Sequence, residues 1–276
     1  MNVQYKQEIA KYGKKDGIIA LVYFLYWVVI QYVSLILVGD VFILPFGSIA
    51  RLAVSWFIWL APMFVYVLVK ERSLASIGFH RRNFGRALLV GLAFSALALS
   101  LREGLLPGLV LGWEFHPLNT FLYFFLFTLL AASVEDIAFM GFIQPRLYGL
   151  IRKDILAVLA GAFLFGFIHV TGEMIYFGPA HIMVTFSFRM YQWMVFFIIW
   201  NLIFRKYFSL FPVIMLHTAA NLAGINRFWV DAGPGDGVNS VFSFYLLVVA
   251  VIAWALVSWL RSRKVTPGTN EWTSPQ

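Results

Sequence analysis

Five polar side chains lie inside long apolar runs of the sequence, where they are costly to bury and able to do chemistry. Glu135 and Asp136 are adjacent in one run, His169 lies in the next, and His217 and Asn221 share a later one. A single acid at the centre of a membrane helix costs about 2.5–3.5 kcal/mol, so such acids usually face a partner or a water-filled cavity. The two acids therefore predict a functional site. The alternative is that they pair with a basic side chain and serve only packing or assembly.

The spacing of these residues predicts that they meet at one depth. If the turn between the first two runs lies near Arg152, Glu135 precedes it by 17 residues and His169 follows it by 17. In an antiparallel hairpin of helices that rise about 1.5 Å per residue, equal counts mean equal depth. His217 and Asn221 are four residues apart, so they share one helix face, within about two turns of the depth of Glu135.

A carboxylate, two imidazoles and a carboxamide around one pocket favour hydrolysis by an activated water. Glu135 and His169 can hold the water and take its proton as it attacks a carbonyl carbon. His217 and Asn221 can donate to the oxyanion that develops, and one such donor is typically worth about 2.7–4 kcal/mol. A covalent serine route is disfavoured, because Ser133 does not lie in a Gly-x-Ser-x-Gly elbow.

Zinc is the alternative to a metal-free site. Glu135, His169 and His217 form a known type of zinc ligand set, and the metal would activate the same water. The chain has no His-Glu-x-x-His motif, asparagine is not a typical zinc ligand, and cysteine is absent from the sequence. We therefore expect no metal and no other cofactor, with zinc as the rival interpretation.

The composition indicates a membrane protein. Of the 276 residues 61% are hydrophobic and only 12% are charged, with a mean hydropathy of +0.82. Several runs approach the ~20 residues that cross a bilayer, and the alternating pattern of an outer-membrane barrel is absent. The predicted fold is all-α, a polytopic membrane bundle of about eight transmembrane helices with a buried catalytic core.

Eight spans and one transmembrane domain are predicted. The domain covers 17–264, with the motif-bearing core at 120–223, between a basic amino-terminal segment (1–16) and a disordered tail (265–276). The spans are 17–37, 53–69, 87–101, 120–141, 155–170, 188–204, 207–223 and 241–260.

The positive charges predict the orientation. Seventeen of the 21 lysines and arginines fall on one side of the predicted spans, which places both termini in the cytoplasm of a protein of the inner (plasma) membrane. The net charge of +8 therefore comes from lysines and arginines in the loops between the spans. We expect membrane lipids as partners and no nucleic acid. Trp193 is expected to be an interfacial anchor, and His80, His116 and His181 are expected in solvated connections.

Three short motifs carry a resemblance to a known family. They are EDIAFM at 135–140, FGFIH at 165–169 and HTAAN at 217–221. They resemble the signature Glu-Glu-x-x-x-Arg, Phe-x-x-x-His and His-x-x-x-Asn of the CAAX-protease and bacteriocin-processing (CPBP) family, the Abi or Rce1-like glutamic intramembrane proteases. The resemblance implies an eight-helix endopeptidase that cuts a membrane-bound or lipid-modified peptide or protein. It assigns water activation to Glu135 and His169, and the oxyanion site to His217 and Asn221.

The sequence departs from this signature at two positions. Asp136 replaces the second glutamate, and Met140 replaces the arginine that would stand four residues further along the helix. Asp136, a supporting residue, is therefore expected to be neutral or to be served by another group such as Arg189. The loss of the arginine also favours an alternative function, a non-proteolytic membrane scaffold or regulator. A proton-coupled transporter is a third interpretation, but no inverted repeat is visible.

Overall fold

The structure is a computed structural model that describes residues 2–38, 49–80, 84–85, 88–93, 117–177 and 179–223. Within these ranges the chain forms helices and short connections, with no strand. The predicted all-α fold is therefore confirmed. The predicted span at 241–260, most of the span at 87–101, the tail at 265–276 and His116 lie outside the described residues.

Three stretches in the described part of the chain are long and apolar enough to cross a membrane. They are Lys14–Val33, Leu118–Ile151 and Asp154–Gly172, and they coincide with the first, fourth and fifth predicted spans. The first lies in α2 (Lys14–Val38) and the third in α8 (Asp154–Phe177). The second combines α6 (Leu118–Asp136), the π-helix η3 (Ile137–Ile143) and α7 (Gln144–Ile151). A helical membrane bundle is thus confirmed, while the count of eight spans stays a prediction.

The remaining elements overlap the second, sixth and seventh predicted spans with shifted ends, except for two short helices, at 3–11 and 74–77, that were not predicted. In chain order the remaining elements are α1 (Val3–Lys11), α3 (Ile49–Tyr66), the π-helix η1 (Val67–Glu71), the 3-10 helix η2 (Leu74–Ile77), α9 (Pro179–Tyr207) and α10 (Phe211–Ala223). The prediction of a connection around His181 is wrong, because α9 begins at Pro179 and includes it. Proline suits the first position of a helix, where its missing N–H would have no partner.

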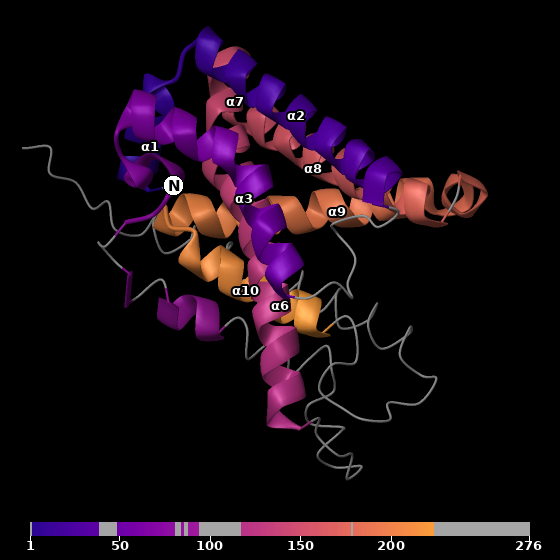
Figure 1. The fold of residues 1–276 in the computed structure, drawn as a ribbon. Helices are drawn as coiled ribbons and strands as arrows, with labels where there is room; N and C mark the ends of the chain where they lie inside the picture. Colours follow the sequence, from indigo (N-terminus) through magenta and orange to yellow (C-terminus); the bar gives the residue numbers. More distant parts are fainter. Residues whose placement is uncertain are drawn as a thin grey trace, which may run out of the picture.

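Helix α10 lies against α6, and α8 contacts η3, the element that continues α6 (Figure 1). The long helices α8 and α9 contact each other extensively, and α10 packs against both α6 and α9. Helix α2 lies along α7 and also contacts α8, while α3 packs against α6. Residues that are far apart in sequence are therefore held around the carboxyl end of α6.

The π-helix η3 follows directly after Glu135 and Asp136 and is entirely buried. A π-helix leaves backbone groups poorly paired at its ends, and buried carbonyls need partners. The Arg146 guanidinium supplies them, because Nη1 donates to the Phe142 carbonyl at 3.0 Å and to the Gly141 carbonyl at 3.4 Å. Arg146 is fully buried and also pairs with Glu71 at the end of η1.

The amino-terminal segment is an ordered part of this arrangement. Helix α1 packs against α7, and the buried Tyr5 hydroxyl donates to Gln144 Oε1 at 2.8 Å. The Tyr12 ring lies 4.7 Å from the Arg146 guanidinium carbon. Burial raises the pKa of the Tyr12 phenol, so its hydroxyl stays protonated and donates to Glu8 Oε1 at 3.0 Å. The segment therefore supports α7, which follows the two acids and η3 along the chain.

We predict that the fold depends on the Arg146–Glu71 pair. Arg146→Met leaves the Glu71 carboxylate without its base, and removing one member of a buried pair typically costs about 3–5 kcal/mol. The melting temperature in detergent should fall, and it should recover in part in the Arg146→Met/Glu71→Met double variant. Equal melting temperatures for the wild type and Arg146→Met would show that the pair contributes nothing.

Candidate active site

Three of the predicted site residues converge on one carboxylate oxygen. Glu135 is the penultimate residue of α6, His169 lies in α8 and His217 lies in α10. His169 Nε2 is 3.3 Å from Glu135 Oε2, and His217 Nε2 is 3.6 Å from the same oxygen. The three side chains thus lie within direct reach of one another, at the similar depth that their residue counts predict.

The hydrogen bonding of His169 fixes which of its nitrogens faces Glu135 as an acceptor. Nδ1 lies 2.8 Å from the Phe165 carbonyl oxygen, which can only accept, so Nδ1 carries the proton. In the neutral ring Nε2 then presents its lone pair to Glu135 Oε2. The FxxxH spacing explains this contact, because a carbonyl four residues earlier lies directly beneath the ring on the helix.

The partner of Asp136 is the second imidazole. Asp136 Oδ1 lies 3.2 Å from His217 Nδ1, and both side chains are buried. Another group therefore serves Asp136, as expected, but it is His217, and the Arg189 guanidinium named in that expectation donates to Gln192 Oε1 at 3.1 Å. Adjacent residues on a helix point about 100° apart. The two acids therefore contact His217 at different ring nitrogens, Asp136 at Nδ1 and Glu135 at Nε2.

The side chains of the site fall into two pairs that differ in how much of their surface is exposed. The side chains of Glu135 and His169 keep 16% and 11% of their surface exposed, whereas those of Asp136 and His217 keep 0% and 1%. The Glu135–His169 pair is therefore the less buried part of the site, and the Asp136–His217 pair is the fully buried part.

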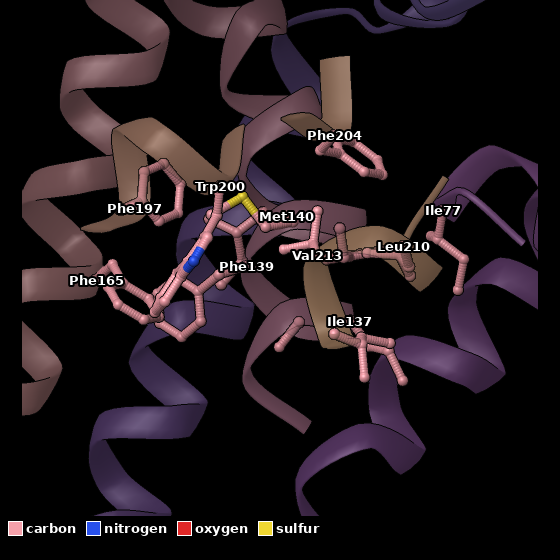
Figure 2. Packing of buried hydrophobic residues seen from close by; sticks show 14 of the residues in the cluster. Ile77, Ile137, Phe139, Met140, Phe165, Phe197, Trp200, Phe204, Leu210 and Val213 are labelled. Carbon is pink, nitrogen blue, oxygen red and sulfur yellow. The ribbon is translucent and has the colours of Figure 1, made fainter. Parts of the chain in front are cut away.

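Met140 lies in the core beside the site and not at an ion pair. Its sulfur accepts a weak contact from Asn201 Nδ2 at 3.6 Å, and both residues are fully buried. Asp136 and Met140 straddle the start of η3, where a turn takes more residues than in an α-helix, so a spacing of four no longer stacks them directly. Figure 2 shows Met140 and Phe139 of η3 near Phe165 and Trp200. The Phe165 ring contacts both the Phe139 and the Trp200 rings edge to face.

Asn221 lies one turn after His217 on α10 and is partly exposed. The helix is continuous from Phe211 to Ala223, so the two residues share a face, as their spacing predicts.

Two tryptophans lie at the site that the sequence analysis did not place there. The Trp193 ring stacks on His169 at a centroid distance of 4.0 Å, and the Trp200 ring stacks on His217 at 4.1 Å. The prediction of Trp193 as an interfacial anchor is therefore wrong. The available signal was their spacing of seven residues, two helical turns, in a run without any of the three motifs.

The third described histidine with a placed side chain, His80, lies in a connection, as predicted, but is half-buried there. Its ring packs against Phe208 at a centroid distance of 4.5 Å, and its Nε2 atom is buried. Burial lowers the pKa of this imidazole.

Within the described ranges, no group of three or more histidine, cysteine, aspartate or glutamate side chains has an arrangement suited to a metal ion. The two Nε2 atoms approach a single oxygen of Glu135, and Nδ1 of each ring is engaged by Phe165 or Asp136.

Residues 117–223 match the family model of the Rce1-like type II CAAX prenyl endopeptidases. The match begins just before α6 and ends with α10, so it contains Glu135, Asp136, His169, His217 and Asn221. Comparison with curated proteins and with solved structures gave no match.

Proposed function

We propose that the chain is an intramembrane endopeptidase of the glutamic type, because residues 117–223 match the Rce1-like family model and carry its motif residues. The observation that supports this proposal best is the approach of both imidazole Nε2 atoms to one buried oxygen of Glu135. Its substrate is a membrane-associated peptide or protein, with a lipid-modified carboxyl-terminal tail as the class that the family description indicates. It acts in the inner membrane with both termini cytoplasmic.

Glu135 and His169 activate the water in this proposal. Because Phe165 holds the proton on Nδ1 of His169, Nε2 and Glu135 Oε2 are two acceptors 3.3 Å apart. One water satisfies both by donating a hydrogen to each, and its oxygen lone pair is then aimed away from them. As this oxygen bonds to the substrate carbonyl carbon, Glu135 takes the proton and later gives it to the departing amide nitrogen, as the C–N bond breaks.

His217 and Asn221 stabilise the oxyanion. Asp136 accepts the hydrogen on Nδ1 of His217, which turns Nε2 toward the site. With both nitrogens protonated, the ring donates through Nε2 to the carbonyl oxygen as negative charge develops on it, and the Asn221 amide donates from one turn further along α10. Donors held in a buried site need no reorganisation during the reaction, which is why each is effective.

A non-proteolytic membrane scaffold or regulator is the second candidate. The observation that favours it is Met140, which contacts Asn201 where the family signature has an arginine. The two candidates differ in one respect that can be measured, because a scaffold has no turnover that depends on Glu135.

We predict that Glu135→Gln abolishes most peptide cleavage. The amide cannot take a proton from water, and a general base contributes about 10²–10⁴-fold to a rate. The measurement uses purified protein in lipid vesicles with fluorogenic peptides, including one carboxyl-terminal peptide prepared with and without a prenyl group. Glu8→Gln, which changes a carboxylate of α1 outside the site, should leave turnover unchanged. Wild-type turnover equal to that of Glu135→Gln would eliminate the peptidase and favour the scaffold.

We predict that Asp136 acts through His217. Asp136→Asn removes the carboxylate that holds Nδ1–H, so kcat should fall about 10²–10³-fold, as for the loss of one oxyanion donor, with little change in KM. Asp136→Glu keeps a carboxylate and should recover part of kcat. Equal kcat for Asp136→Asn and the wild type would show that the 3.2 Å contact has no role in the reaction.

We predict that catalysis does not require zinc. Metal analysis of the purified protein should find much less than one zinc per chain, and turnover should survive dialysis against a chelator. Loss of turnover on chelation, restored by added zinc alone, would instead assign Glu135, His169 and His217 as metal ligands.

A further inference from the structure

Both histidines of the site lie flat against tryptophans of a single helix. The Trp193 and His169 rings are 4.0 Å apart with an interplanar angle of 28°, and the Trp200 and His217 rings are 4.1 Å apart at 24°. The two tryptophans are seven residues apart on α9, so they project from one face two turns apart. One helix therefore contacts both imidazoles in the same geometry.

These stacks differ from most aromatic contacts of the surrounding core. The buried pair Trp27–Trp59 meets edge to face at 73°, and Phe165 meets Trp200 at 89°. Behind Trp200, the Phe196 ring stacks at 5.1 Å and 22°, on the same helix. Trp200 thus lies in close parallel contact with His217 and is itself packed by further rings, among them Phe165, which Figure 2 shows beside it.

The stacking supplies a constraint that the hydrogen bonds lack. A bond from Nδ1 to the Phe165 carbonyl or to Asp136 fixes one ring nitrogen, but the imidazole plane can still tilt about that bond. An indole face packed on the ring removes this tilt. It also favours positive charge on the ring electrostatically, which suits an imidazole that gains or shares a proton during a reaction.

We infer that Trp193 and Trp200 are positioning residues, and that α9 serves as a template which holds the two Nε2 atoms on Glu135 Oε2. This inference rests on the proposed peptidase function, and it assigns a role to a helix that carries none of the family motifs. Trp193 acts on the water-activating His169, and Trp200 acts on His217.

The first test compares kcat, KM and melting temperature for leucine and phenylalanine variants in vesicles. Trp200→Leu and Trp193→Leu should each lower kcat by about 10²-fold, the effect of a group misplaced by ~1 Å, while KM stays close to that of the wild type. Trp200→Phe and Trp193→Phe keep a flat ring and should recover much of kcat. Trp59→Leu is the control, matched in burial to Trp200, because it removes a buried indole whose ring partner is Trp27 and not a histidine.

The second test needs no turnover and so separates this inference from the proposed function. The chain has five histidines, which allows selective isotope labelling and proton NMR of their rings. Protons above an indole face are shifted upfield, so Trp193→Leu should move only the His169 signals, and Trp200→Leu only those of His217. Trp59→Leu should move neither set.

Each outcome decides one point. If the NMR shifts change as expected but the wild type cleaves no peptide, the template stands and the peptidase fails. The inference is overturned if the leucine variants leave the histidine signals unchanged, or if they retain full kcat. It is also overturned if Trp59→Leu, still folded at the assay temperature, loses as much kcat as they do.

Discussion

The structure depends on one buried carboxylate oxygen that two imidazoles share. Glu135 Oε2 lies 3.3 Å from Nε2 of His169 and 3.6 Å from Nε2 of His217, so groups from α6, α8 and α10 must be placed to within a fraction of a hydrogen-bond length. A buried acid without partners is strongly unfavourable in a bilayer. The packing of these three helices is therefore constrained by the same contacts that would perform the chemistry.

The surrounding elements hold that arrangement from three directions. At α7, Arg146 binds carbonyls of η3 and pairs with Glu71, while α1 packs against the same helix. From within the core, α9 lays Trp193 and Trp200 on the two imidazoles. On α3, the Trp56 indole donates to the Ser133 hydroxyl at 3.0 Å, two residues before Glu135. Elements outside the motifs thus fix the residues inside them.

The sequence predicted correctly the depth of the site residues along their helices, but not the direction in which each side chain points around its helix. Counting residues from Arg152 sufficed to bring Glu135 and His169 together, because an α-helix has a constant rise. It did not predict that Asp136 turns to His217 and not to Arg189, since that depends on a π-helix which begins at the next residue and whose formation is a tertiary effect. Trp193 was misassigned because an indole that stacks on a histidine and one at a membrane interface have the same composition signal.

In the proposed reaction, Glu135 and His169 act together on one water. A double-mutant cycle on kcat tests this joint action most directly. Residues that act as a unit have strongly non-additive effects. The Glu135→Gln/His169→Gln double variant should therefore be no slower than the slower of the two single variants. A double variant slowed by the product of the two single effects would show that the two side chains act independently and would contradict the account.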